Sequence, residues 1–158
     1  LKDANWKIEE IEAEFRAQIE MARRYVPRIS HINCHMVCES CAPEIADLID
    51  RLAREYGLNI DPHERGYESI SLWGRNDTTA ETRIASAVKT LQNLKPGKYF
   101  FIDHPGYDTP EMRAIWHIGY ENVAADRDGV TKVFTSSKVK DVISERNIKL
   151  VSYRDLTK

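Results

Sequence analysis

The sequence predicts an α/β protein in which amphipathic helices alternate with short apolar strands. Segments with the apolar spacing of a helix recur along the chain, and runs typical of strands lie between them. The run Lys98–Asp103 holds an uninterrupted apolar stretch, as in strands buried on both faces of a parallel sheet. Such a series folds as a mostly parallel sheet or a (β/α) barrel. At 158 residues, we expect a single domain over residues 1–158.

Two helices in the first part of the chain have the clearest apolar stripes. The first is capped by Asp3 or Asn5 and ends at Pro27. The second begins at Pro43 and stops at Gly57, because glycine suits the left-handed backbone at a helix end. The apolar positions are Ile8, Ile11, Phe15, Ile19 and Ala22 in the first helix, and Ile45, Leu48, Ile49, Leu52, Ala53 and Tyr56 in the second.

Further helices are predicted in the second half of the chain. One starts near Thr79, two more cover Glu111–Tyr120 and Asn122–Phe134, and Ser136 or Ser137 caps the last. The apolar positions of the helix that starts near Thr79 are Ile84, Ala87, Val88, Leu91 and Leu94. Those of the last helix are Val139, Val142 and Ile143.

Short strands are expected between these helices. They are Arg28–Cys34, Leu58–Ile60, Ile70–Trp73, Lys98–Asp103 and Ile148–Ser152. The third lies inside Asp61–Asp77, whose prolines and glycines predict a long irregular loop. Ligands usually bind at the carboxyl ends of parallel strands, so the residues that follow these strands are the candidates for function.

The composition excludes several classes of partner. The net charge is −2 without a basic excess, so we expect no binding to nucleic acid. No apolar run approaches the roughly 20 residues that a membrane span needs. The first residues lack the charged-then-apolar pattern of a signal peptide, which favours a cytoplasmic location. The sequence begins with leucine rather than methionine, which is compatible with a trimmed chain.

Three histidines stand at the ends of predicted strands. His31 and His35 lie four residues apart, so their neutral imidazoles can converge on a metal ion. The alternative is one buried, hydrogen-bonded histidine and one exposed one. His104 follows the buried strand at a Pro-Gly turn, where it can donate a proton to a leaving group or simply bond the local backbone. Asp103 beside it can orient a base or bind a metal.

Three cysteines form a second pattern in the same region. Cys34, Cys38 and Cys41 have the spacing with which radical S-adenosylmethionine enzymes hold a four-iron cluster. However, Ser40 stands where those enzymes usually have an aromatic residue, and no glycine-rich motif follows. A mixed Cys/His zinc site and three unremarkable reduced thiols are the alternatives. An odd number of cysteines does not favour a disulfide framework.

Several stretches have a familiar order along the chain. They are E-F-R-A-Q-I-E at Glu14–Glu20, S-H-I-N-C-H at Ser30–His35, the helical segment Pro43–Leu58, the strand and H-P-G turn within Lys98–Tyr107, and the closing segment from Asp126 to Leu156. Together they resemble the YdjC-like family of metal-dependent carbohydrate deacetylases, which includes the chitooligosaccharide deacetylases. The resemblance spans nearly the whole chain.

The resemblance implies a (β/α) barrel of the deacetylase type with about seven strands, distorted or partial in this chain. It also implies a divalent cation, magnesium or zinc, and removal of the acetyl group from an N-acetylated amino sugar. Position by position, His35 and His31 match the metal-binding histidines. His104 matches the histidine of the proline-glycine motif and is assigned to proton transfer, with Asp103 beside it.

The resemblance also assigns residues to the carbohydrate substrate. Arg127 matches an arginine before the closing helix, and Tyr107 follows the H-P-G turn, where its ring can stack on a sugar. Trp73, Trp116 and Tyr120 can stack in the same way or pack in the core. Asn33 stands where the family usually has aspartate, and an amide cannot serve as the anionic partner of a metal-binding histidine.

Further departures leave a second function open. Val37 replaces the last histidine of the family's motif, and the paired aspartates of the family's amino-terminal half have no counterpart here. We therefore expect the carboxyl-terminal portion of a YdjC-like domain, acting as a deacetylase or as a non-catalytic relative that binds sugar or a protein partner. A homodimer is a further expectation. The cysteines lie where the family varies, and we interpret them as incidental.

Overall fold

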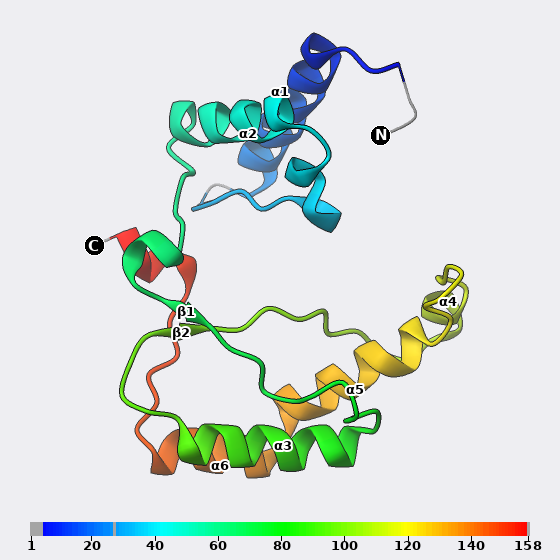
Figure 1. Cartoon of the computed structure of the whole chain (residues 1–158), viewed down its shortest axis with the longest axis vertical. Helices are drawn as coiled ribbons and strands as arrows, with labels where there is room; N and C mark the ends of the chain where they lie inside the picture. Colours follow the sequence, from blue (N-terminus) through cyan, green and yellow to red (C-terminus); the bar gives the residue numbers. More distant parts are fainter. Residues whose placement is uncertain (1–4, 27, 158) are drawn as a thin grey trace. The chain divides into compact units, whose positions relative to one another are not determined.

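The computed structural model describes residues 5–26 and 28–157, and the contacts divide the chain into two compact units. The first comprises the described residues of Leu1–Pro62 and Val151–Lys158, and the second comprises His63–Leu150. Helices predominate in both units, and each unit has its own apolar core (Figure 1).

The first unit is built on α1 (Ile8–Tyr25) and α2 (Pro43–Glu55), which pack against each other (Figure 1). Ile19 of α1 shares a core with Leu48 and Leu52 of α2. Leu58 completes the buried part of this core, and the half-buried side chains packed against it are Ile8, Ile11, Phe15, Ile29, Ile32 and Tyr56. Both helices and their apolar stripes are as the sequence predicted. Two short 3₁₀ helices, η1 (His35–Ser40) and η3 (Tyr153–Thr157), belong to the same unit.

The ends of these helices were predicted in part. Gly57 has a φ of +65° after α2, and the Leu58 N–H then donates to the Ala53 carbonyl at 2.7 Å, so the glycine stop is confirmed. The helix α1 is preceded by Lys7 without a side-chain cap, so the prediction of an Asn5 cap is wrong. Asp3 and Pro27, also predicted at its ends, lie outside the described residues.

Charged side chains border the packed faces of α1 and α2. Arg16 donates to both carboxylate oxygens of Glu55 at 2.6 and 2.7 Å, and Arg51 donates to those of Glu12 at 3.1 and 2.7 Å. Hydrogen bonds from Arg51 and then from Arg16 lower the pKa of Glu12 to about 2. Since α1 carries so many charges, it is no candidate membrane helix, and no helix in the described ranges is long and apolar enough to span a bilayer.

The second unit packs three helices together: α3 (Ala80–Asn93), α5 (Val123–Thr135) and α6 (Ser137–Glu145) (Figure 1). The short helix α4 (Pro110–Arg113) contacts α5. The buried residues of the core are Leu72, Ala87, Leu91, Val133, Val139 and Val142. These helices were predicted within one or two residues, apart from the segment around α4.

The helix caps in this unit differ in strength. Thr79 caps α3, because its hydroxyl accepts the Thr82 N–H at 3.2 Å and the Thr82 hydroxyl accepts the Thr79 N–H at the same distance. Ser136 is the cap residue of α6, as predicted, but its side chain makes no capping bond.

The predicted helix over Glu111–Tyr120 is wrong. The helix α4 ends at Arg113, and Gly119 has a φ of +87° in the turn that follows. The apolar side chains on which the prediction rested are exposed, with Ile118 at 92% and Trp116 at 59%. Because helices gain most of their stability from packing an apolar face, this segment has little to hold it helical.

The sheet consists of two short parallel strands, β1 (Glu68–Ser69) and β2 (Tyr99–Phe100). The Glu68 N–H donates to the Lys98 carbonyl at 2.9 Å, and the Ile70 N–H to the Phe100 carbonyl at 3.0 Å. β2 lies within the predicted strand Lys98–Asp103, but β1 lies just before the predicted strand Ile70–Trp73, which forms no strand. The parallel pairing of the two strands agrees with the sequence pattern. A third 3₁₀ turn, η2 (His63–Arg65), precedes β1.

The predicted (β/α) barrel is wrong, because the described chain is mostly helical and its two short strands close no barrel. The regions Arg28–Cys34, Leu58–Ile60 and Ile148–Ser152 contain no strand. A single bond, from the Ile32 N–H to the Leu58 carbonyl at 3.3 Å, links the first two of them. Apolar composition favours extended backbone, but a strand forms only where a neighbour supplies its hydrogen bonds.

Candidate active site

His31 lies half-buried in the first unit and stacks on the ring of Tyr153 in η3. The ring centroids are 3.7 Å apart with an interplanar angle of 9°, and the Ser30 hydroxyl lies 3.1 Å from Nδ1 of the imidazole. Burial lowers the pKa of His31, which favours the neutral ring. Burial, together with the nearby charge of Asp61, raises the pKa of Tyr153. The stack therefore joins two uncharged rings near neutral pH.

His35 is exposed and opens the 3₁₀ turn η1, and Asn33 is exposed just before it. Met36 and Val37, which follow, have φ values of 52° and 55° in the left-handed region. A β-branched residue is rarely found there, so Val37 is strained by about 1 to 2 kcal/mol. His31 is thus half-buried and hydrogen-bonded, and His35 is exposed. This arrangement is close to the alternative to a metal site that the sequence left open.

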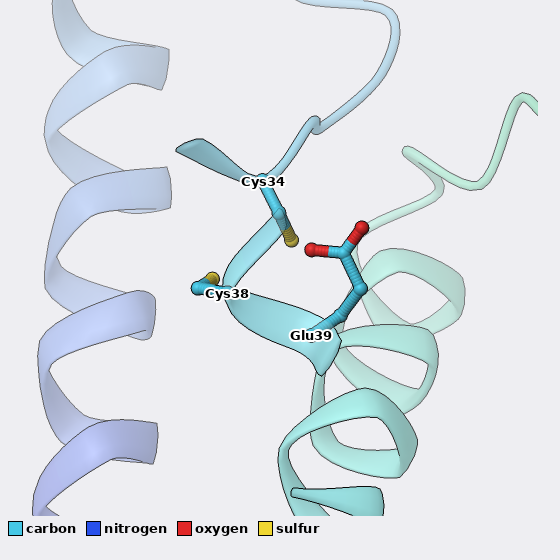
Figure 2. Close-up of side chains that lie close together, drawn as sticks. All are labelled: Cys34, Cys38 and Glu39. Atoms are coloured by element: carbon cyan, nitrogen blue, oxygen red, sulfur yellow. The ribbon is translucent and has the colours of Figure 1, made fainter. Parts of the chain in front are cut away.

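The turn η1 gathers three potential metal ligands of another kind. One donor atom each from Cys34, Cys38 and Glu39 lies within 4.8 Å of the others, and all three residues are half-buried. Figure 2 shows the Cys34 sulfur directed toward the Glu39 carboxylate, with Cys38 on the same turn. Burial, followed by contact with Glu39 and Cys38, raises the pKa of Cys34 to about 12. The spacing of the cysteines alone did not indicate Glu39 as a member of the group.

The described residues do not by themselves complete the metal site expected around His35. Zinc sites use three or four protein ligands. In the described ranges, three His, Cys, Asp or Glu donors come close enough to share an ion at Cys34, Cys38 and Glu39, and this group includes neither His31 nor His35. Two imidazoles alone are too few donors for a closed site.

In the second unit, His104 lies in the H-P-G segment after β2, which has no regular secondary structure. The Asp103 carboxylate accepts the backbone N–H of His104 at 2.7 Å. The carboxylate thus shapes the turn through the backbone, while the His104 side chain is exposed to solvent. The assignment of both residues to catalysis stays a prediction.

The H-P-G turn is tied to α5 by backbone and side-chain bonds. The Gly106 N–H donates to the Arg127 carbonyl at 3.2 Å, and the Thr131 hydroxyl donates to the Gly106 carbonyl at 2.8 Å. A Cβ placed on Gly106 would lie 3.3 Å from both Arg127 Cβ and Met112 Cε. Glycine therefore permits the close approach that fixes the turn after His104 on the helix.

The side chain of Arg127 is half-buried beside this turn, and its Nε is buried without a hydrogen-bond partner among the described residues. A buried guanidinium nitrogen normally donates a hydrogen bond. The assignment of Arg127 to substrate binding stays a prediction.

A half-buried ion pair that the sequence prediction missed lies next to Arg127. Arg83 of α3 forms a salt bridge with Asp126 and also donates to its backbone carbonyl at 2.9 Å, while the Tyr120 hydroxyl donates to the Asp126 carboxylate at 2.6 Å. Burial opposes ionisation, but the bonds from Tyr120 and Arg83 prevail and lower the pKa of Asp126. The position of Arg83 could have indicated this pair, because Arg83 lies four residues before the fully buried Ala87 on one helix face.

The aromatic residues considered for sugar binding have different surroundings. Tyr107 is 72% exposed and Trp116 is 59% exposed. Trp73 instead packs edge-on against Phe101, with centroids 5.0 Å apart, on the apolar core. Of the four aromatic residues considered, Tyr107 and Trp116 are the ones with rings open to a ligand.

The predicted site residues thus form two groups. The first unit contains His31, Asn33 and His35, and the second contains Asp103, His104, Tyr107 and Arg127.

Comparison with known families identifies the chain. The profile of the family described as YdjC-like protein matches residues 1–145. The chain belongs to the YdjC-like family. The resemblance seen in the S-H-I-N-C-H and H-P-G motifs is therefore confirmed.

Two curated relatives of this YdjC-like chain come from Listeria innocua serovar 6a. The first, named Carbohydrate deacetylase 1, is 26% identical over 160 residues, which cover 97% of this chain and 62% of that protein. The second, named Carbohydrate deacetylase 2, is 24% identical over 165 residues, which cover 95% of this chain and 61% of that protein. The chain thus spans about three fifths of the length of these relatives.

Proposed function

We propose that this YdjC-like protein is a carbohydrate deacetylase that hydrolyses the acetamide bond of an N-acetylated amino sugar. The observation that carries the proposal is the family match over residues 1–145, joined by two relatives named carbohydrate deacetylase that align with nearly the whole chain. In this reaction a water oxygen bonds to the acetyl carbon, the carbon–nitrogen bond breaks, and acetate and the free amine leave.

His104 is the proposed proton donor to the leaving amine. Its imidazole is exposed, while the Asp103 carboxylate and the bonds from Gly106 to α5 hold the backbone on either side of it. A titratable ring on a fixed turn meets the geometric need of general acid catalysis, because proton transfer requires the donor within hydrogen-bond reach of the substrate.

Three residues are proposed to bind the sugar. Tyr107 offers an exposed ring two residues after the proline of the H-P-G turn, and Arg127 offers a buried nitrogen that lacks a partner in the described ranges. Asn33, exposed beside the His35 turn, is the third. Stacking on an aromatic face and hydrogen bonding to hydroxyl groups are suitable means of holding a sugar.

Dependence on magnesium or zinc is part of the proposal, with His35 and His31 as assigned ligands. The neutral form of His31 that its burial favours is the form that binds metals. A cation held by these two residues needs more donors than the described residues bring to them. Metal content of the purified protein and of a His35→Ala variant tests this part, since the variant is expected to hold one divalent ion fewer than the wild type.

The direct test of the reaction is acetate release from N-acetylglucosamine oligomers. A His104→Gln variant keeps the size and polarity of the side chain but cannot transfer a proton, so we expect a loss of roughly 100- to 10,000-fold in kcat. His117→Gln is the matched control, because His117 is also exposed and its ring contacts the Ile118 carbonyl at 3.0 Å. No acetate from the wild type, or an unchanged rate in His104→Gln, contradicts the proposal.

A non-catalytic role in sugar binding is the second candidate. It is favoured by the absence of a third donor near His31 or His35 among the described residues. Oligomer binding measured by calorimetry separates the two functions. Binding that Tyr107→Ala weakens, without acetate release, supports the second candidate, and the absence of both binding and acetate release contradicts both.

A further inference from the structure

The strongest unassigned feature of the molecule is the group formed by Cys34, Cys38 and Glu39. Two sulfur atoms and one carboxylate oxygen lie within 4.8 Å of one another on a single turn (Figure 2). All three residues are half-buried, so this is no cluster of solvated surface charges. Their chemistry is also distinct from that of the histidines expected to bind the catalytic metal.

An independent observation points to a ligand at this group. Oε2 of Glu39 is buried from solvent and has no hydrogen-bond partner among the described residues. Buried carboxylate oxygens are normally paired, because removing them from water without a partner is costly. The Glu39 carboxylate faces the Cys34 sulfur, and thiols are weak hydrogen-bond donors. A cation would satisfy this oxygen where the protein does not.

The backbone explains how three ligands gather in so short a segment. Cys34 precedes η1 in an extended conformation, and the left-handed residues Met36 and Val37 then reverse the chain. This reversal returns Cys38 and Glu39 to the side of Cys34. The turn packs against α2.

We propose that Cys34, Cys38 and Glu39 bind one zinc ion. Two thiolates and a carboxylate are accepted zinc ligands, and the fourth position is open to water. On binding, the two thiols release their protons to solvent and each sulfur forms a bond to the metal, with no change in oxidation state. In a tetrahedral site with metal–ligand bonds of about 2.0 to 2.3 Å, the ligand atoms lie about 3.3 to 3.8 Å from one another. Side-chain rotation therefore has to shorten the separations between the three ligand atoms by about 1 Å.

The composition of the group selects the metal. Thiolates favour zinc over magnesium, which prefers oxygen ligands. An iron–sulfur cluster held by three cysteines would need Cys41, whose sulfur does not belong to the group. This assignment replaces the interpretation of the cysteines as incidental, and it stands independently of the deacetylase proposal.

A zinc ion at this position would organise the segment that carries His35. The exposed histidine lies between two ligands in the sequence, Cys34 and Cys38, so the metal would fix the turn on both sides of it. The role we assign to this zinc is therefore structural, and its loss should free the His35 turn without unfolding α1 and α2.

Titration of the reduced, metal-free protein with cobalt(II) and zinc tests the proposal. One equivalent of cobalt should produce the near-ultraviolet charge-transfer absorption of a thiolate–cobalt bond, and zinc should abolish it by displacement. We expect zinc affinity to fall roughly tenfold or more in Cys38→Ser and in Glu39→Gln. Both variants are compared with the wild type by thermal unfolding without metal, which shows whether the fold is retained.

Cys41→Ser is the matched control, because it removes a thiol from the same segment but not from the group. It should keep the cobalt absorption and the zinc affinity. Absence of a thiolate–cobalt band in the wild type overturns the proposal, and so does an unchanged affinity in Cys38→Ser and Glu39→Gln. Isolation of brown protein whose iron requires Cys41 also overturns it. Because no readout depends on acetate release, failure here is distinct from failure of the deacetylase proposal.

Discussion

The two histidine-bearing segments are held in different ways. The His104 turn is fixed by its own hydrogen bonds, because the backbone N–H of His104 donates to the Asp103 carboxylate and that of Gly106 donates to the Arg127 carbonyl on α5. The His35 turn contains two left-handed residues, and no backbone hydrogen bond joins it to α1 or α2 among the described residues. Our account is that the first segment is organised by the protein alone, and the second by a metal held on Cys34, Cys38 and Glu39.

The ion pairs of the two units also differ, because the arginine of one is shielded from solvent and that of the other is exposed. In the second unit, the Arg83 side chain is 11% exposed and bonds both Asp126 and the Asp77 carbonyl. In the first unit, Arg51 is 53% exposed and pairs with Glu12 at the helix surface. Ion pairs near water contribute little, whereas breaking a pair that is largely shielded from water leaves a charge with less compensation. This contrast can be tested by matched substitutions.

The largest effect is expected from Arg83→Met, which keeps an unbranched apolar side chain and removes the guanidinium with its bonds. It should lower the free energy of unfolding by about 2 to 3 kcal/mol at neutral pH. Because the pKa of Asp126 is held below its usual 3.8, the stability from this pair is present above that pH and lost as the pH falls below it. The deficit of the variant should therefore shrink in acid. Urea unfolding at several pH values measures this, and a deficit independent of pH would contradict the role of the pair.

Thr131→Val should have the next largest effect, because it removes the hydroxyl that donates to the Gly106 carbonyl at 2.8 Å and keeps the side-chain shape. We expect a loss of about 1 kcal/mol of stability. If the hydroxyl positions the His104 turn, kcat for acetate release should fall while the KM stays nearly unchanged. Thr135→Val is the control, since the Thr135 hydroxyl bonds only within its helix. Equal losses of kcat in both variants would contradict a positioning role.

Val37→Gly should change stability in the opposite direction. Glycine tolerates a φ of 55°, and the Val37 side chain is 59% exposed, so little packing is lost. Glycine also makes the unfolded chain more flexible, which opposes folding. We expect the relief of backbone strain to exceed this entropy cost by about 0.5 to 1 kcal/mol, so the melting temperature should rise. A fall in melting temperature would mean that the turn is not left-handed in solution.

The smallest effect on stability at neutral pH is expected from Arg51→Met. Hydrogen bonding to Arg51 is the first cause of the low pKa of Glu12, about 2 instead of 4.5. A lowered carboxyl pKa gives stability that is present above the ordinary value and lost as the pH falls through the lowered one. The variant should thus lose less stability than the wild type between pH 4.5 and pH 2. Unfolding curves that are parallel in this range would contradict the contribution of the pair.

The sequence predicted local features better than those that depend on distant partners. Helices α1, α2, α3, α5 and α6 follow from apolar spacing, because the face that each helix buries is encoded within it. Strands were predicted less well. Ile102, in the run expected to be buried, is 59% exposed. The segments around Ile32 and Leu150 have no strand to pair with in the described ranges. The barrel prediction failed for this reason.

The candidate sites show the same limit. His104 and Arg127 could be proposed from sequence, because a family motif marks them. Their connection through Gly106 could not, since it joins residues 21 positions apart. In the cysteine segment, spacing alone directed attention to Cys41, whereas the left-handed turn brings Glu39 into the group instead. Such turns at non-glycine residues are too rare to be predicted from composition.

Hydrogen exchange measured by mass spectrometry, with and without one equivalent of zinc, tests the central contrast most directly. We predict that amides in residues 34–41 exchange quickly in the metal-free protein and are protected by zinc. The Gly106 amide and its neighbours should be protected to the same degree in both samples, because their bonds to α5 need no metal. Equal protection of the two segments without metal, or no response of residues 34–41 to zinc, would contradict the account.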